Sequence, residues 1–334
     1  MAGLTLGKIR GLQEISSPQG LITVLALDHR GTLIKAMGLD AKDKNVYTQV
    51  RDFKFSVIKY LLPHATAVLI DPQYGGAEAI ARGIIPGCKG IMITLESSGF
   101  TGEPTARLNE IIPGWSPTLI KRMGASAIKF KIDYHPYAGI VTEQMEALVA
   151  SVSSEAKRLD IPLLLEPVSY SIDSHVKKES AEFARQRPEI VLETALRLGP
   201  MVDVLKLEFP HDASFNKNEK DWEKACLDIT QTSPVPWVLL SAGVEFDIFK
   251  RQAKTACQAG ASGYVAGRAI FQEATGMHGQ GREDFLKNVA ARRMLELKEI
   301  AADSARPWMK GYPGLSDSVD QNWITNYSKQ PTNL

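Results

Sequence analysis

The chain alternates between short apolar runs and longer stretches in which apolar positions recur every three or four residues. The runs are rich in β-branched residues and end in a polar residue or a turn, which is typical of buried strands. Eight such runs occur, at residues 22–27, 67–70, 91–95, 127–132, 162–165, 202–207, 237–240 and 262–266. Helical periodicity occurs at residues 46–62, 117–123, 143–159, 188–198, 222–230, 248–259 and 283–303.

This alternation of strands and helices predicts a parallel sheet. Eight strand–helix units in about 280 residues fit one closed (β/α)8 TIM barrel, whose usual size is about 250 residues. A doubly wound sheet is the competing fold, but Asp28-His29-Arg30-Gly31 follows the first run in place of a glycine-rich dinucleotide fingerprint. We therefore expect an α/β protein whose residues 1–334 form a single TIM-barrel domain.

The end of the chain, residues 305–334, shows no periodicity of either kind. A terminal segment like this is either an arm docked on the domain or locally disordered. Its aromatic residues Trp308, Trp323 and Tyr327 favour a docked arm.

Several predicted strands end in a polar residue that a sheet does not itself require. In a TIM barrel, the carboxyl ends of the strands form the face that carries the active site. Residues 97–114 and 209–220, which follow the third and sixth strands, are long enough to cover this face, whereas most other connections are short. We expect the site at this rim, with these two segments as lids.

The sixth predicted strand, residues 202–207, contains Lys206 and is followed by Glu208. A charged ammonium group is costly to bury, so strands of this kind rarely carry one without a use. A buried lysine gives up its proton more readily, and the neutral amine can attack a carbonyl to form a Schiff base. Alternatively, the side chain reaches solvent at the strand end or pairs with Glu208. This segment alone leaves both interpretations open.

The fourth predicted strand places Lys129, Lys131 and Asp133 on one face, because successive side chains alternate. Two lysines that point into a barrel would repel each other. A cationic neighbour is a recognised way to favour the neutral amine of another lysine, which here would be Lys206. In the alternative interpretation one of the two, Lys131 more readily than Lys129, extends upward and only solvates the rim.

Carboxylates end several of the predicted strands, and two of them are the stronger candidates for chemistry. Glu166 closes the run at residues 162–165 and precedes Pro167, a rigid exit that would hold the carboxylate at the top of the barrel and suits a general acid/base. Asp28 ends the first strand. For its carboxylate, a role in orienting a charged group is at least as well supported as a role in proton transfer. Either carboxylate could also pair with a rim lysine. Asp71 and Asp133 are weaker candidates, because aspartate before proline or at a strand end is ordinary turn chemistry.

The last two predicted strands end in small residues. Ser241 and Gly243 follow the seventh strand, and Gly267 and Arg268 follow the eighth. Small residues leave backbone N–H groups accessible in the position where this fold often holds a phosphate, and arginine adds a bidentate positive charge. Glycines after strands are also common in plain turns. The occurrence of both loops together favours a phosphate site.

Other chemistries find less support in the sequence. The six histidines show no paired ligand spacing, and the three cysteines form no C-x-x-C pair. No G-x-S-x-G elbow occurs. We therefore expect no metal ion and no other cofactor.

Composition excludes several classes of partner. The 39 basic and 38 acidic residues are interspersed and leave a formal net charge of +1, so neither a nucleic-acid-binding stripe nor a basic membrane helix is visible. The first residues lack the apolar core of a signal peptide, and no apolar run approaches the roughly 20 residues that span a bilayer. We expect a cytoplasmic protein that binds a small molecule, with no nucleic-acid or membrane partner. The sequence is compatible with a homo-oligomer.

Taken together, these residues resemble those of the class I tagatose-1,6-bisphosphate aldolases. The resemblance covers most of the chain and is carried by the segments LALDHRG (25–31), LIDPQYG (69–75), AIKF (127–130), LE (165–166), DVLKLE (203–208), LSAGV (240–244) and GRA (267–269). Residues 166–168, 236–244 and 259–269 also resemble the sulfofructose-phosphate aldolases. The chain departs from the tagatose enzymes at residues 131–133 and 211–213.

The resemblance implies a metal-independent aldolase that cleaves a phosphorylated ketose, tagatose 1,6-bisphosphate first, into dihydroxyacetone phosphate and glyceraldehyde 3-phosphate. It makes Lys206 the Schiff-base lysine, Glu166 the acid/base, and Asp28 and Lys129 supporting residues. The implied holders of one phosphate are Ser241, Gly243, Gly267 and Arg268. Sulfofructose 1-phosphate is the alternative substrate. An alternative of another class is a non-catalytic barrel that binds a sugar phosphate in a regulatory role.

Overall fold

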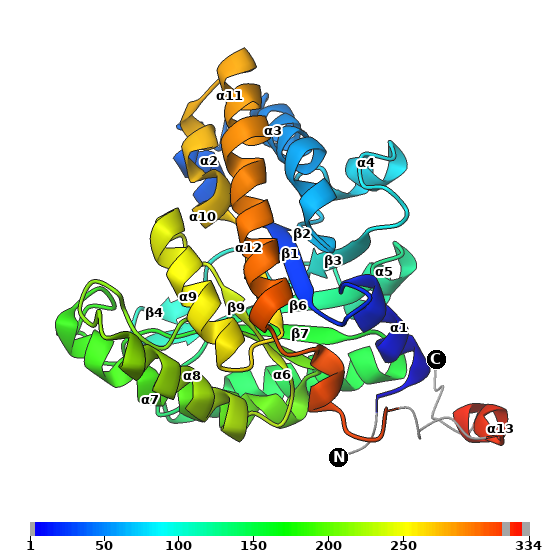
Figure 1. Ribbon diagram of the computed structural model, residues 1–334, viewed down its shortest axis with the longest axis vertical. Coiled ribbons are helices and arrows are strands. Elements are labelled where there is room, and N and C mark those ends of the chain that lie inside the picture. Colours follow the sequence, from blue (N-terminus) through cyan, green and yellow to red (C-terminus); the bar gives the residue numbers. More distant parts are fainter. Residues whose placement is uncertain (1–3, 316–320, 329–334) are drawn as a thin grey trace.

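The computed structural model describes residues 4–315 and 321–328. Within these residues, eight parallel strands close into a barrel that helices surround (Figure 1). The strands are β1 (Ile22–Leu27), β2 (Ala67–Ile70), β3 (Gly90–Thr94), β6 (Ala127–Asp133), β7 (Leu163–Val168), β8 (Val204–Leu207), β9 (Trp237–Leu240) and β10 (Gly263–Ala266). β10 pairs with β1 to close the barrel, so the predicted TIM-barrel fold is confirmed.

Helices follow the strands along the chain. They are α1 (Leu6–Glu14), α2 (Gly31–Ala36), α3 (Val46–Leu61), α4 (Gly76–Ala81), α5 (Pro117–Arg122), α6 (Ile140–Arg158), α7 (Ala181–Leu198), α8 (Glu219–Thr232), α9 (Phe246–Gln258), α10 (Arg268–Phe271), α11 (Gly279–Phe285), α12 (Ala291–Ser304) and α13 (Trp323–Ser328). A π-helical turn, Leu286–Ala290, joins α11 to α12. No helix in the described part of the chain has the length and apolar character needed to cross a bilayer.

Helix α7 begins earlier than the sequence predicts. Its first residue is Ala181, and the hydroxyl of Ser180 caps it by accepting a hydrogen bond from the N–H of Phe183. Pro188, which the sequence suggests as a helix start, lies inside the helix. Phe183, in the turns before Pro188, is fully buried. The packing of this side chain offsets the free-energy cost of the backbone hydrogen bond that proline cannot donate.

The barrel has an inner and an outer apolar core. Inward side chains such as Val24, Leu69 and Leu164 form the inner core, and outward side chains such as Ile128 and Phe130 pack against the helices. The two sets alternate along each strand, as β geometry requires. The inner core is apolar only toward the amino ends of the strands, because polar side chains take the inward positions toward the carboxyl ends.

Two segments close the amino end of the barrel. Helix α1, which the sequence analysis does not predict, contributes Leu12 to the inner core. Trp308 from the 3₁₀ turn Trp308–Gly311 joins the same core, and its indole N–H donates to the hydroxyl of Ser16 at 3.1 Å. Residues 305–312 therefore lie against the barrel. The rest of the expected C-terminal arm includes residues 316–320 and 329–334, which lie outside the described residues, and the division into one domain and an arm stays a prediction.

Buried ion pairs fix two connections of the scaffold. Lys54 of α3 pairs with Asp71 at the end of β2, and both side chains are 0% exposed. Asp71 also accepts hydrogen bonds from the backbone N–H groups of Gln73 and Tyr74. At the amino end of the barrel, Lys8 of α1 pairs with Asp203 at 2.8 Å. Asp71 is thus a structural residue of the β2–α4 turn.

We expect Lys54→Met to lower the free energy of unfolding by about 3–5 kcal/mol, because it leaves the Asp71 carboxylate buried without its cation. Urea unfolding followed by circular dichroism measures the change. Lys59→Met on the same helix is the control, since that lysine is exposed, and it should change the free energy of unfolding far less than Lys54→Met does. Equal effects of the two substitutions would show that the buried pair does not stabilise the fold.

Candidate active site

A cavity of about 790 Å³ opens at the carboxyl ends of the strands. Residues that follow β1, β3, β8, β9 and β10 line it, together with inward side chains of β6 and β7. The expected location of the site at this rim agrees with the cavity. Parts of both segments expected to cover the site, residues 97–99 and 211–214, also line the cavity.

The floor of the cavity is a cluster of buried ionic side chains. The ammonium nitrogen of Lys129 lies 2.8 Å from Asp28 Oδ2, 2.6 Å from Glu96 Oε1 and 2.8 Å from Glu166 Oε2. The ammonium nitrogen of Lys206 lies 2.9 Å from Glu166 Oε1. Glu166 therefore bridges the two lysines. None of the five side chains is more than 12% exposed.

Strand register brings these residues together. Lys129, Glu166 and Lys206 are consecutive inward-facing groups on the neighbouring strands β6, β7 and β8. On these strands an apolar residue that also points inward lies two positions earlier. Ala127 precedes Lys129 in this way, and Val204 precedes Lys206. The side chain of Lys206 neither reaches solvent nor pairs with Glu208, which binds Lys178 instead. The alternative interpretation of the Lys206 segment is therefore wrong.

The opposite charges in this cluster stabilise one another's ionised forms. Burial alone would raise the pKa of Asp28 and of Glu166, but Lys129 and Lys206 outweigh it and lower both. Burial alone would lower the pKa of Lys129, but Asp28, Glu166 and Glu96 together raise it well above its ordinary value. Lys129 is thus a permanent cation at neutral pH, and Asp28 and Glu166 are carboxylates.

Lys131 faces the cavity, but the expected repulsion between it and Lys129 does not arise. Lys131 pairs with Asp133, and its backbone N–H donates to Glu96 Oε2 at 3.0 Å. Lys129 has its own three carboxylates. Each lysine on this face of β6 therefore has acidic partners, so two bare inward charges, as the sequence analysis supposes, are not present.

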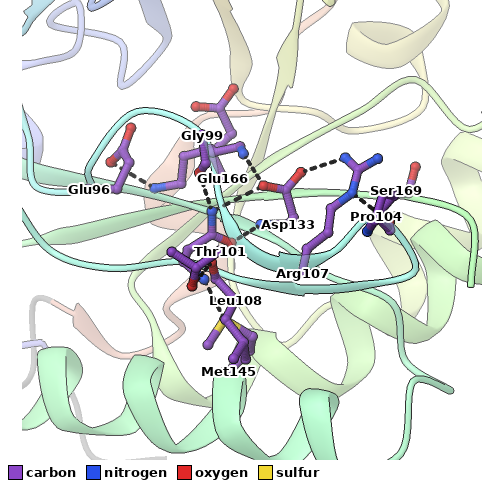
Figure 2. A network of polar contacts seen from close by, with 12 residues as sticks. Glu96, Gly99, Thr101, Pro104, Arg107, Leu108, Asp133, Met145, Glu166 and Ser169 are labelled. Carbon is purple, nitrogen blue, oxygen red and sulfur yellow. Dashed lines mark hydrogen bonds and ion pairs between the residues drawn. The ribbon is translucent and has the colours of Figure 1, made fainter.

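Asp133 ties the segment after β3 to the barrel. That segment folds into an antiparallel hairpin of β4 (Thr101–Glu103) and β5 (Ala106–Leu108). Asp133 accepts a hydrogen bond from Arg107 at 3.3 Å (Figure 2). It also accepts one from the side-chain amide of Asn109 at 3.0 Å. The Asn109 amide also donates to the carbonyl of Gly99. Asp133 therefore holds the hairpin beside the cavity.

The four residues expected to hold a phosphate lie together at another part of the cavity wall. The backbone N–H of Gly267 lies 3.3 Å from the hydroxyl of Ser241. Gly243 has φ +73°, and a Cβ there would lie 3.2 Å from the guanidinium carbon of Arg268, so the position favours glycine. The Nε of Arg268 is buried and has no hydrogen-bond partner among the described residues. This wall therefore combines two glycine loops with a guanidinium group whose Nε has no partner among the described residues.

Two residues at the floor of the cavity, Glu96 and His29, are not predicted from the sequence. Glu96 pairs with Lys129 and also accepts a hydrogen bond from the hydroxyl of Thr94 at 2.7 Å. The available signal was its position directly after the third strand, which matches that of Asp28 after the first. His29 has a buried Nδ1 with no partner among the described residues, and burial, opposed by Asp28 and aided by Arg268, lowers its pKa to about 4. Its ring is therefore neutral at pH 7.

The described residues contain no group of three or more His, Cys, Asp or Glu side chains arranged to hold a metal ion. The cation at the centre of the carboxylates is the ammonium group of Lys129. The chemistry available from this arrangement is that of an amine, a carboxylate and fixed charges.

A model of the DeoC/LacD family of aldolases matches residues 22–273, which include the whole barrel from β1 to β10. The chain belongs to this family of aldolases. It is 31% identical to tagatose 1,6-diphosphate aldolase 2 of Enterococcus faecalis, over 92% of this chain and 97% of the relative. It is 30% identical to tagatose 1,6-diphosphate aldolase of Listeria monocytogenes, over 95% of this chain and 98% of the relative. The resemblance noted in the sequence is confirmed.

Solved structures of more distant sequence share the fold. A Schiff-base-forming fructose-1,6-bisphosphate aldolase superimposes with a TM-score of 0.57 at 18% identity, over 87% of this chain and 98% of that chain. Fructose-bisphosphate aldolase from Plasmodium falciparum superimposes with a TM-score of 0.69 at 12% identity, over 91% of this chain and 97% of that chain. At these identities the likeness bears on the barrel fold alone.

Proposed function

We propose that this aldolase forms a Schiff base between Lys206 and a phosphorylated ketose, and that the ketose is tagatose 1,6-bisphosphate. One observation carries the mechanism: Glu166 contacts both Lys206 and Lys129 in a buried cluster at the floor of the cavity. The substrate follows from the relatives named tagatose 1,6-diphosphate aldolase, which match nearly the whole chain. The products are dihydroxyacetone phosphate and glyceraldehyde 3-phosphate.

The first steps build the iminium ion. Glu166 Oε1, 2.9 Å from the Lys206 nitrogen, accepts a proton from its ammonium group and leaves a neutral amine. The amine attacks the C2 carbonyl, and the oxygen of the resulting carbinolamine leaves as water after Glu166 returns the proton. Lys129 remains charged throughout, because three carboxylates raise its pKa, and it keeps the Glu166 carboxylate in place between the two nitrogens.

Cleavage uses the iminium ion as an electron sink. The Glu166 carboxylate takes the proton of the C4 hydroxyl, a C4 carbonyl forms, and the electron pair of the C3–C4 bond moves to the iminium to give an enamine. The aldehyde product leaves. Glu166 then returns the proton to C3, and water hydrolyses the imine to release dihydroxyacetone phosphate and free Lys206.

The C1 phosphate lies against the wall formed by Ser241, Gly243, Gly267 and Arg268. Two features support this placement. Glycine loops after the last two barrel strands provide backbone N–H donors. The buried Arg268 Nε has no hydrogen-bond partner within residues 4–315 and 321–328, and it can donate to a phosphate oxygen. Neutral His29, which borders Gly267, adds no charge to this wall.

We expect sodium borohydride added with dihydroxyacetone phosphate to attach the ligand irreversibly to Lys206, since reduction traps the imine. Peptide mass spectrometry locates the adduct, and the reaction is run with EDTA. Lys206→Met should give no adduct and no cleavage. An adduct on Lys129 or Lys131 in the unmodified protein would overturn the assignment of the nucleophile.

We expect Glu166→Gln to lower kcat for cleavage by about 10²–10⁴-fold, because the amide cannot accept the C4 hydroxyl proton. Rapid-quench measurement separates this step from imine formation, which borohydride trapping reports. Glu179→Gln is the matched control, since Glu179 lines the outer part of the same cavity and is exposed. Cleavage at nearly the normal rate in Glu166→Gln would remove the general-base role.

We expect Arg268→Ala to weaken binding of a ketose 1-phosphate by about 1.5–3 kcal/mol, the usual contribution of a hydrogen bond to a charged group. Binding of the corresponding unphosphorylated ketose should change much less. Calorimetric titration of both ligands provides the comparison. Equal losses for the two would mean that Arg268 supports the loop structure and does not bind phosphate.

A further inference from the structure

A second arginine in the cavity wall resembles Arg268 in the lack of a hydrogen-bond partner for a buried nitrogen. Arg187 of α7 also has a buried Nε with no hydrogen-bond partner among the described residues, and it lines the same cavity. Its terminal nitrogens lie 3.8 Å from Glu208 and 3.8 Å from Asp212, which is longer than a hydrogen bond. A guanidinium group normally has its donors satisfied when it is buried. Arg187 thus has donors available for a ligand.

The two arginines lie over different strands. Arg268 follows β10, and its wall also includes the loop after β9. Arg187 contacts Glu208, which follows β8, and belongs to the helix that follows β7. The strands run in the order β10, β9, β8, β7 around the barrel. The carbon chain of a substrate whose C1 phosphate lies at Arg268 therefore passes Lys206 on β8 and then Glu166 on β7. The end of the substrate that is remote from C1 then lies toward Arg187.

A lysine completes this part of the wall. Lys178, in the connection between β7 and α7, donates to Glu208 Oε1 at 2.8 Å and to the carbonyl of Ser169 at 2.6 Å. An ammonium group has three N–H donors, so one remains. The other carboxylate oxygen of Glu208 accepts from the N–H and the hydroxyl of Ser169. Glu208 is therefore occupied in positioning Lys178 and the β7 loop.

We propose that Arg187 and Lys178 form a subsite for a tetrahedral oxyanion at the end of the substrate remote from the C1 phosphate. The inference rests on the proposed function and extends it. In the ketose this anion is carried by C6, and after cleavage it is carried by C3 of the aldehyde product. A phosphate and a sulfonate share the oxygen geometry that a guanidinium fork and an ammonium group recognise.

Two departures from the tagatose enzymes also lie on the wall of this cavity. Residues 131–133 place Lys131 on the cavity wall beside Glu166, and residues 211–213 place Asp212 against Arg187. Asp212 and Glu208 balance the charges of Arg187 and Lys178 before the substrate enters. A purely structural role for Arg187, in which it only holds these two carboxylates, is the competing explanation.

The aldol condensation tests the subsite, because the remote anion is then carried by the aldehyde alone. Dihydroxyacetone phosphate is combined with glyceraldehyde 3-phosphate, with 3-sulfolactaldehyde, or with uncharged glyceraldehyde. We expect Arg187→Gln to raise KM for whichever anionic aldehyde the unmodified enzyme prefers by about 10- to 100-fold. KM for glyceraldehyde should change by less than about 2-fold. Arg187→Lys, which keeps the charge but loses the fork, should fall between.

Matched controls are available on the same segments. Arg185 lies two residues before Arg187 and is exposed, and Lys177 precedes Lys178 and is exposed. Arg185→Gln and Lys177→Gln should leave all three aldehydes unaffected, whereas Lys178→Gln should raise KM for the anionic aldehyde selectively. Equal effects of Arg187→Gln on charged and uncharged aldehydes would establish the structural role and overturn the subsite. So would an unchanged KM for both anionic aldehydes.

Failure of the subsite and failure of the proposed mechanism give different results. Dihydroxyacetone phosphate alone does not extend to Arg187, so borohydride should trap it on Lys206 equally in the unmodified enzyme and in Arg187→Gln. Absence of the adduct in both would refute the Schiff-base mechanism. A normal adduct together with equal effects on all aldehydes would refute only the subsite.

Discussion

The organisation of the catalytic face depends on the cost of burying the ammonium group of Lys129. An isolated charge at that depth would not remain ionised, so its charge requires the convergence of Asp28, Glu96 and Glu166 from three different strands. This requirement constrains the register of β1, β3, β6 and β7 at once. It also determines what Glu166 can do, because one of its oxygens is held by Lys129 while the other faces Lys206.

A single set of strands therefore provides both stability and chemistry. Below the cluster, inward residues such as Ala127 and Val204 pack in the apolar core that α1 and Trp308 close. One pleat higher, the same strands present Lys129 and Lys206. The side chains of the floor are thus held from beneath by close packing and from the sides by ion pairs, which suits a site in which proton transfers depend on fixed distances.

Local pattern predicts the strands well here because each is a short apolar run that ends in a polar residue, as at Leu27 and Asp28. The same signal locates most of the floor of the cavity. Ion pairing is harder to predict: the sequence places Lys131 and Asp133 on the same face of a strand, but it does not indicate that the two pair with each other. Proline misleads the prediction of α7, because the local cost of Pro188 is outweighed by burial of Phe183. Arg187 lies in the missed part of that helix.

The hydrogen bond between Trp308 and Ser16 joins residues 292 positions apart. Contacts of such long range form late, because the loop between them must close first. During synthesis, the inner core therefore stays unsealed at its amino end until Trp308, which comes after the last barrel strand β10, has left the ribosome. Until then α1 has only part of its docking surface, and the newly made strands expose apolar side chains to other proteins. The amino end of the barrel is therefore closed only after Trp308 has been made, and not when the last strand, β10, has been made.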